Sequence, residues 1–207
     1  KLMRIQACNQ LNASTPLALC TFDNFSLSYY PNEPSDSGIS AYQQMEQILR
    51  YCKAYAAQFS MDAPNLLMQG GTGLGKTHLS LAIAHEAIEK GYGVIYGSAQ
   101  NMVTNLEKER FQKDNEQQDT NQLMLQCDLL IIDDLGTEFS TSFVTAAIYN
   151  IVNTRLMTHK PTIISTNLSM KELEERYTER FASRILGSYI PLFFRGKDIR
   201  QQKRRKK

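Results

Sequence analysis

The sequence predicts an α/β fold in which a parallel sheet is covered by helices on both faces. Strand-like and helix-like segments alternate from about residue 41 onward, which indicates βαβ units. The segment CDLLIIDD (127–134) is a continuous apolar run that ends in acids, as in a strand buried on both faces. A strand signal at 65–69 is joined to a helix signal by a glycine-rich loop. These three observations fix the class before any single element is assigned.

The elements of the first half are predicted from apolar periodicity. Apolar residues recur at three- and four-residue steps from Met45 to Phe59, the spacing of a helix with one buried stripe. Gly91 is placed to end the helix that follows the glycine loop. The expected order is helix 45–59, strand 65–69, helix 77–90, strand 93–97, helix 99–111 and a polar loop over 112–120.

The second half continues the same alternation. The capping-box pair of Ser169 and Glu172 opens one of its helices. Pro191 lies inside the last apolar run, where proline is tolerated if the strand is at an edge. The expected order is strand 127–134, helix 143–151, strand 161–166, helix 170–177 and strand 189–194.

The expected domain organisation is simple. Residues 1–40 are predicted to form an arm and linker, because TFDNFSLSYY is aromatic and the following stretch is rich in Pro, Ser and Gly. Residues 41–200 are expected to form one folded domain, and 201–207 a basic tail. From Arg195 onward there are eight Lys or Arg against one acid, whereas the net charge of the whole chain is only +2. The tail is therefore a candidate contact for a phosphate backbone, or simply a solvated terminus.

Composition excludes several classes of protein. No apolar run approaches the roughly 18 residues that a membrane helix needs. The four cysteines are widely spaced, without a CxxC pair, so neither a zinc site nor a disulfide framework is indicated. We therefore expect a cytoplasmic protein with no membrane partner. The chain lacks an initiator Met, and we expect it to be a fragment.

The glycine loop matches G-x-x-x-x-G-K-[ST], a phosphate-binding pattern. Its residues are Gly70, Gly71, Thr72, Gly73, Leu74, Gly75, Lys76 and Thr77, followed by His78. Glycines let successive backbone N–H groups point at phosphate oxygens, Lys76 would neutralise the β- and γ-phosphates, and the Thr77 hydroxyl would bind Mg²⁺. His78 is more often a packing residue than a chemical one in such a place. The strand before and the helix after the loop support nucleotide binding. Dinucleotide binding is disfavoured, because the loop is not G-x-G-x-x-G and contains the phosphate-binding Lys.

Polar residues end two predicted strands. Asp133 is expected to hold Mg²⁺ through its water shell, and Asp134 to orient an attacking water, which favours hydrolysis over transfer. Glu138 is a weaker candidate for the role of Asp134. Asn167, at the end of TIISTN, is expected to hydrogen-bond the γ-phosphate or the water. Strand capping is the structural alternative for each.

These motifs and ERFASRI (179–185) are part of a wider resemblance, which runs from TFDNFSLSYY (21–30) to GKDIR (196–200). The sequence resembles AAA+ ATPases of the initiator and helicase-loader clade, among them the helicase loaders DnaC and DnaI and the transposition helper IstB. The resemblance implies a P-loop NTPase three-layer sandwich whose five-stranded parallel sheet has the order 5-1-4-3-2. It implies ATP and Mg²⁺ as cofactors.

The same resemblance implies residue roles. Asp133 matches the metal-binding acid, Asp134 the catalytic acid and Asn167 the first sensor. Arg184 matches an arginine finger, a cation that one protomer inserts into the site of its neighbour. Two further arginines also match: Arg180 a companion of the finger, and Arg200 the second sensor. A solvated helix face is the alternative for Arg180 and Arg184.

The chain also departs from the family pattern. It has no room for a sizeable helical lid after the fifth strand, and the residues before 21 are too few for the N-terminal domain with which loaders grip the helicase. We expect an ATPase core that loads the replicative helicase through a missing N-terminal domain, contacts single-stranded DNA and forms a homo-oligomer on ATP binding. An IstB-like transposition helper and an ATP-binding switch without hydrolysis stay open as alternatives, and a small-molecule kinase is disfavoured.

Overall fold

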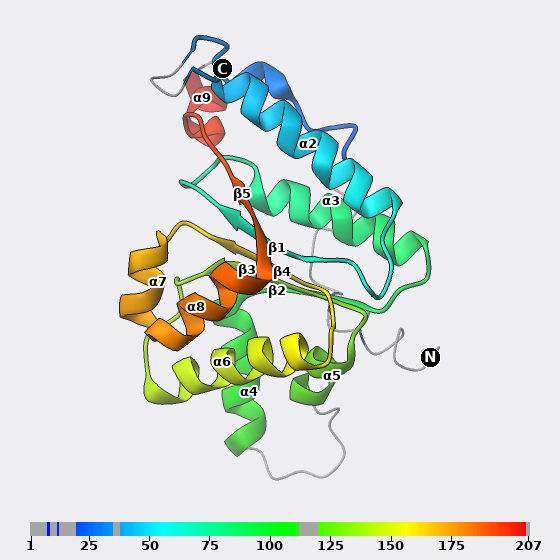
Figure 1. The fold of residues 1–207 in the computed structure, drawn as a ribbon, viewed down its shortest axis with the longest axis vertical. Helices are drawn as coiled ribbons and strands as arrows, with labels where there is room; N and C mark the ends of the chain where they lie inside the picture. The colour runs from blue at the N-terminus through cyan, green and yellow to red at the C-terminus, as the bar shows by residue number, and fades with distance from the viewer. Residues whose placement is uncertain (1–7, 9–11, 13–19, 35–37, 112–119, 206–207) are drawn as a thin grey trace.

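The structure, a computed structural model, describes residues 8, 12, 20–34, 38–111 and 120–205 (Figure 1). Five parallel strands form one sheet: β1 (Asn65–Gln69), β2 (Val94–Ser98), β3 (Leu129–Leu135), β4 (Thr162–Thr166) and β5 (Tyr189–Phe193). Their order is β2-β3-β4-β1-β5, which is the expected order read from the other edge. β5 is an edge strand, which explains why it tolerates Pro191.

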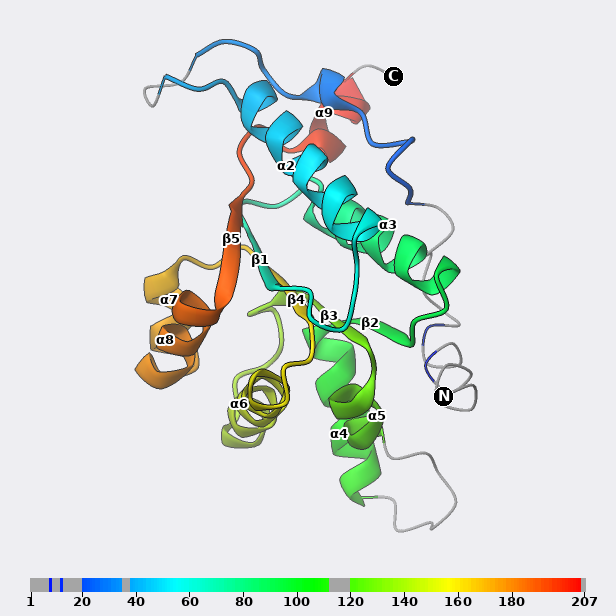
Figure 2. The same cartoon turned by 45° about the vertical axis from the view of Figure 1, so that its right-hand side comes forward.

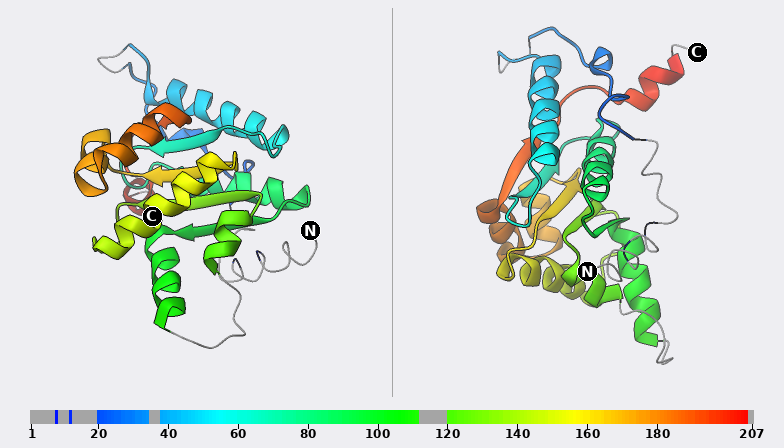
Figure 3. Two further views of the ribbon diagram at one scale, coloured as in Figure 1. Left: turned by 60° about the horizontal axis from the view of Figure 1, so that its bottom comes forward. Right: turned by 90° about the vertical axis from the view of Figure 1, so that its right-hand side faces the viewer.

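Helices cover both faces of the sheet (Figures 2 and 3). One face carries α2 (Ala41–Ala57) and α3 (Lys76–Glu89). The other carries α4 (Ala99–Phe111), α5 (Thr120–Gln126), α6 (Ser142–Met157), α7 (Met170–Arg176) and α8 (Glu179–Ser188). Alternate side chains of a strand point to opposite faces, so β3 supplies both layers, with Ile131 in the first and Ile132 in the second. The three-layer α/β sandwich is confirmed.

α5 and α9 (Ile199–Arg205) were not expected from the sequence, and α8 was expected only as the helix face that carries Arg180 and Arg184. α5 lies just after the predicted polar loop, and it has only seven residues, too few for a clear apolar period. Thr120 and Met124 are nevertheless buried in it. α9 is also short and mostly charged. Its first residue, Ile199, donates its backbone N–H to the Gly73 carbonyl at 3.0 Å, so tertiary contact with the phosphate loop positions this helix.

A buried arginine fastens the far end of the sheet. Arg155 of α6 is fully buried, and its guanidinium donates to the carbonyls of Met124, Cys127 and Pro161 at 2.7, 3.1 and 2.7 Å. It also donates to the Thr162 hydroxyl at 2.9 Å. One side chain thus ties α5, α6 and the starts of β3 and β4 together. Among the described helices, none has the length and apolarity needed to cross a membrane.

Candidate nucleotide-binding site

The phosphate loop joins β1 to α3 at the carboxyl end of the sheet, as expected from its sequence context. Gly75, the residue before the helix, has a φ of 91°, and an added Cβ there would lie 2.8 Å from the Phe25 ring. Gly73 has a φ of 70°, and an added Cβ would lie 2.1 Å from a carboxylate oxygen of Asp198. Backbone conformation and close packing therefore both require glycine at these two positions.

Lys76 is held inside this loop. Its side chain is almost fully buried, and its Nζ donates to the carbonyls of Gly70 and Gly71 at 2.6 and 2.7 Å. Burial lowers the pKa of Lys76, while the carboxylates of Asp134 and Asp133 act in the opposite direction. The loop thus presents an ammonium group that has lost much of its water shell, and such a charge interacts more strongly with a phosphate than a solvated one does.

Asp133, at the end of β3, is the most extensively hydrogen-bonded acid of the site. It is buried, and its Oδ2 accepts from the Thr77 hydroxyl at 2.9 Å and from the Tyr96 hydroxyl at 2.5 Å. Its Oδ1 accepts from the Ser165 hydroxyl of β4. Hydroxyls from α3, β2 and β4 therefore fix both oxygens of one carboxylate, which orients it toward the start of α3.

The residues expected to bind Mg²⁺ fit that ion. Thr77 and Asp133 place a hydroxyl and a carboxylate oxygen 2.9 Å apart, and hard oxygen ligands are the ones that Mg²⁺ takes beside nucleotide phosphates. Within the described part of the chain, no cluster of three or more His, Cys, Asp or Glu could hold a metal alone. That agrees with an ion that completes its coordination with water and substrate. Bound there, Mg²⁺ would neutralise charge on the phosphates.

Asp134 is set apart from Asp133 by its backbone. Its φ of 52° is left-handed, and the pairing of β3 with β4 is irregular between Ile132 and Leu135. Such irregularities redirect side chains at the edges of sites. The Asp134 backbone N–H donates to the Ser165 hydroxyl at 2.9 Å. Burial and then the charge of Asp133 raise the pKa of the Asp134 carboxyl, which suits a group that accepts a proton.

A cavity of about 280 Å³ lies over the phosphate loop. Three separate segments line it in addition to Asp134: the loop and the start of α3 from Thr72 to His78, the arm, and α9. The arm contributes Cys20, Asn24, Phe25, Ser26 and Tyr29, and α9 contributes Ile199, Arg200 and Lys203. The expected second sensor, Arg200, therefore shares this cavity with Lys76 and Asp134, although it is distant from both in the sequence.

Direct contacts hold the arm and α9 in place around the cavity. The Tyr30 hydroxyl donates to the Leu74 carbonyl at 2.8 Å. The Lys203 ammonium lies 5.3 Å from the centre of the Tyr29 ring, a cation–π contact between α9 and the arm. The arm and α9 lie side by side in Figures 1 and 2. The arm and α9 thus form two walls of the cavity, in addition to the phosphate loop.

His78, which follows the phosphate loop, faces the arm. Its Nε2 lies 2.8 Å from the Thr21 carbonyl, and the Phe25 ring packs edge-on against it at 5.2 Å between ring centres. These contacts support the interpretation of His78 as a packing residue. Because His78 also lines the cavity, its contact with a bound nucleotide stays a prediction.

The remaining expected site residues lie outside the cavity. Asn167 is exposed just beyond the end of β4 and is not among the described residues that line the cavity. Arg184 lines a different cavity, of about 540 Å³, together with Asn65 and Lys160 at the opposite end of the strands. Arg180 is exposed, with its guanidinium 5.8 Å from the centre of the Tyr149 ring. The structure therefore does not bring either arginine to the phosphate loop of its own chain.

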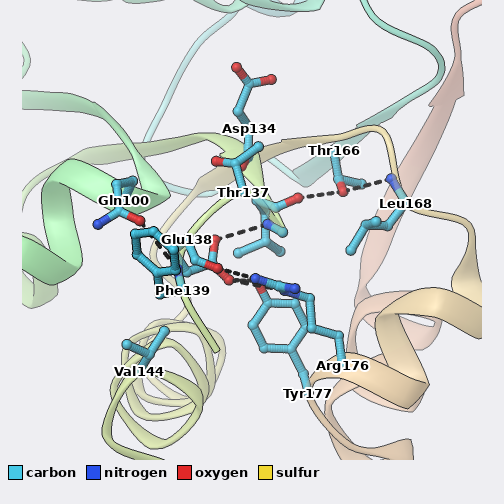
Figure 4. A network of polar contacts seen from close by, with 12 residues as sticks. Gln100, Asp134, Thr137, Glu138, Phe139, Val144, Thr166, Leu168, Arg176 and Tyr177 are labelled. Atoms are coloured by element: carbon cyan, nitrogen blue, oxygen red, sulfur yellow. Dashed lines mark hydrogen bonds and ion pairs between the residues drawn. The ribbon is translucent and has the colours of Figure 1, made fainter. Parts of the chain in front are cut away.

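Glu138, the weaker candidate for a catalytic acid, has a different environment. It is buried, and its carboxylate accepts from the Gly136 backbone N–H at 3.0 Å and from the Tyr177 hydroxyl, and lies 3.4 Å from Arg176 Nε. Figure 4 shows Glu138 directed toward α7 and Asp134 pointing away from it. These contacts disfavour Glu138 for the role expected of Asp134, because the charge of Glu138 is paired within the fold.

Sequence reasoning missed several residues of the site. Tyr96 and Ser165 both donate to Asp133, and the arm closes one side of the cavity. Neither residue belongs to a sequence motif that marks it as a partner of Asp133. The alternation of side chains along a strand could have indicated which face of the sheet each residue occupies, but not that both contact the same carboxylate.

Comparison with known proteins agrees with this geometry. The DnaC helicase loader of Buchnera aphidicola (Acyrthosiphon pisum strain) is 25% identical over 185 residues, which cover 88% of this chain and 70% of that protein. The DnaC of Escherichia coli K12 is 28% identical over 149 residues, covering 70% of this chain and 60% of that protein. The chain therefore spans only part of these relatives.

Solved structures share the fold. A crystal structure of the DnaC helicase loader has a TM-score of 0.71 at 20% identity and covers 87% of this chain and 99% of its own. A DnaI crystal structure has a TM-score of 0.65 at 20% identity, covering 88% and 91%. AMPPCP-bound DnaA from Aquifex aeolicus has a TM-score of 0.66 at 22% identity, covering 90% and 55%.

A family model also matches. Its match covers residues 42–190, from the start of α2 into β5, and includes the phosphate loop, Asp133, Asp134 and Asn167. With the loop, the carboxylate pair and the sheet order in place, the chain belongs to the family of IstB-like ATP-binding proteins.

Proposed function

We propose that this chain is the ATPase core of a replicative-helicase loader, acting in the cytoplasm. The observation that carries the proposal is the convergence of Lys76, Asp134 and Arg200 on one cavity above the phosphate loop. A loop that only bound phosphate would not need the half-buried Asp134 carboxylate and a second cation from another segment. The helicase-loader role rests on the similarity to DnaC proteins.

The hydrolytic step assigns a task to each side chain. Lys76 would bind the β- and γ-phosphates, and the Thr77 and Asp133 oxygens would hold Mg²⁺, which would neutralise phosphate charge. The Asp134 carboxylate orients a water molecule toward the γ-phosphorus and accepts its proton as the P–O bond to the leaving ADP breaks. Its raised pKa favours that acceptance. Arg200, from α9, stabilises negative charge on the phosphates, and Asn167 orients the water from the end of β4.

The position of Arg184 supports action in trans. It lies at the opposite end of the strands from the phosphate loop, so within one chain it does not reach the bound phosphates. Hydrolysis would then require a second copy whose Arg184 completes the site, and ATP binding would promote that assembly. We expect the assembly to contact single-stranded DNA through basic side chains, in a salt-sensitive and sequence-independent way. The helicase is expected to bind through a domain outside this chain.

ATP turnover measured over a range of protein concentrations tests this function. We expect turnover per chain to rise steeply with concentration, with and without single-stranded DNA, because each site is completed by a neighbour. ATP binding without turnover at any concentration would contradict hydrolysis and favour the nucleotide-switch alternative.

The family match keeps a second candidate in view, an IstB-like transposition helper. Such a protein would bind duplex DNA and a transposase. A pull-down with the full-length gene product separates the two: capture of a replicative helicase supports the loader, and capture of a transposase with preference for duplex DNA supports the helper.

A further inference from the structure

The buried Glu138 carboxylate joins two parts of the molecule that the hydrolysis scheme treats separately. It belongs to the loop that follows the catalytic strand β3, and only about 1% of its side chain is exposed. Across from it lies the end of α7, where Arg176 contributes both an ion pair to the carboxylate and a hydrogen bond to the Glu138 carbonyl. Tyr177 donates its hydroxyl to the same carboxylate. Figure 4 shows these groups converging.

In these contacts the Tyr177 hydroxyl is the donor and the Glu138 carboxylate is the acceptor. Burial, followed by the hydrogen bond to Glu138, raises the pKa of the Tyr177 hydroxyl, so the phenol remains a donor. The Gly136 backbone N–H is a further donor to the carboxylate, at 3.0 Å. A buried carboxylate is tolerated when it is paired and hydrogen-bonded in this way, and removing one partner is costly. The contact is therefore directional and difficult to rearrange.

The loop that carries Glu138 directly follows Asp133 and Asp134 in the sequence and packs on the end of β4. Gly136 fits so closely against the Leu168 side chain that an added Cβ would lie 2.4 Å from it. The Thr166 hydroxyl donates to the Leu135 carbonyl at 2.7 Å, and the Leu168 backbone N–H donates to the Thr166 hydroxyl at 3.1 Å. The loop that carries Glu138 is thus fixed to the end of β4, on both sides of Asn167.

Tyr177, the partner of Glu138, also packs against α8, the helix that contains Arg184. Tyr177 ends α7, and its ring lies 4.8 Å from that of Phe181 in the first turn of α8. α7 and α8 pack against each other, and α8 runs directly into β5. Arg184 lies in α8, one turn beyond Phe181. A contiguous set of packed and hydrogen-bonded groups therefore connects the segment that follows Asp133 and Asp134 to the helix that carries Arg184.

We propose that Glu138 is a positioning residue that sets α8, and with it Arg184, relative to the hydrolysis site of the same chain. The inference rests on the proposed function, since it assumes that Arg184 acts on a neighbouring copy. Its physical basis is that a catalytic arginine must be positioned precisely. A displacement of about 1 Å at a catalytic group can cost about a hundredfold in rate, so an arginine on a ten-residue helix needs a fixed support.

A mixing experiment isolates this role. The Asp134→Asn protein keeps its arginine but has a defective site of its own, whereas Arg184→Ala keeps its site but lacks the arginine. Each is expected to be nearly inactive alone, and their mixture to regain turnover, because the first supplies Arg184 to the second. Failure of this parent mixture would contradict the proposed function itself, and the inference with it.

The Glu138→Gln change is then added to the donor protein only. Titrated to saturation against Arg184→Ala, the Asp134→Asn/Glu138→Gln donor should give a plateau rate at least about tenfold below that of the parent donor, because its arginine is misplaced. The matched control is Glu175→Gln, the same chemical change at a residue of α7 that pairs with Lys171 at the surface. It should leave the plateau unchanged. An undiminished plateau with Glu138→Gln would overturn the inference.

Thermal unfolding of each donor separates positioning from loss of fold. If Glu138→Gln does not fold, Tyr177→Phe decides, since it removes one hydroxyl and keeps the ring packing on Phe181. A folded Tyr177→Phe donor with a lowered plateau supports the proposal, and one with the parent plateau overturns it.

Discussion

The hydroxyl of Tyr96 lies 2.5 Å from Oδ2 of Asp133, the same carboxylate oxygen that accepts from Thr77 at 2.9 Å. A residue of β2 thus helps to orient the acid expected to bind Mg²⁺. Burial and the Asp133 charge raise the pKa of Tyr96, which keeps its hydroxyl a donor. Groups of this kind, which contact a metal ligand without touching the metal, tune affinity.

Tyr96→Phe should therefore weaken the part of ATP affinity that depends on Mg²⁺, by about tenfold. Calorimetry of ATP binding with Mg²⁺ and with a chelator measures that part directly. Tyr92→Phe is the control, because its hydroxyl donates to the Phe59 carbonyl at 3.2 Å, away from the site. Equal Mg²⁺ dependence in both variants would show that Tyr96 is only a packing residue.

Lys76→Ala should abolish measurable ATP binding, because the loop loses its only cationic side chain, the one placed to neutralise the β- and γ-phosphates. Lys90→Ala provides a close control: the Lys90 ammonium also donates to two carbonyls, those of Ala56 and Ala57, at 2.5 and 2.6 Å. It should bind ATP normally. Calorimetry that finds unchanged affinity for Lys76→Ala would refute the site assignment.

Arg184→Ala should keep its affinity for ATP and lose turnover by about a thousandfold or more, the contribution of an arginine supplied in trans. The measurement pairs ATP calorimetry with turnover at high protein concentration. Arg50→Ala is the control, since Arg50 is exposed and pairs with Glu46 on α2. Normal turnover of Arg184→Ala at high concentration would rule out the finger.

Arg155→Ala should lower the free energy of unfolding by about 3–5 kcal/mol, because at least four buried acceptors lose their hydrogen-bond donor at once. Removing the exposed Arg50 should cost less than about 1 kcal/mol. Urea denaturation of the two variants compares them. Similar midpoints would mean that water replaces the guanidinium without penalty.

Deleting residues 204–207 should weaken single-stranded DNA binding and flatten its dependence on salt. The deletion removes four cationic residues and spares Lys203, whose side chain contacts Tyr29 beside the cavity. If all four contact phosphates, the slope of log affinity against log salt falls by about 3. Fluorescence anisotropy at several salt concentrations measures it. An unchanged slope would show that residues 204–207 do not contact the DNA phosphates.

Much of the fold was predictable because its signals are local. Apolar periodicity marks α2, α3 and β3, and the phosphate loop is defined by the spacing of Gly70, Gly75 and Lys76. α5 escaped prediction because seven residues cannot show a helical period, and α9 because its position depends on the loop it contacts. Strand order came from family resemblance, since alternation of elements does not specify which strands pair.

The sequence by itself determined the class of fold and the chemistry of phosphate binding, since both arise from neighbours along the chain. Tertiary structure alone decided which groups share a carboxylate or a cavity. It placed Tyr96 and Ser165 on Asp133, brought Arg200 to Lys76, and directed Glu138 toward Arg176. Each of these pairs joins residues separated by 31 or more positions in the sequence, and their contacts depend on how strands and helices pack rather than on local spacing.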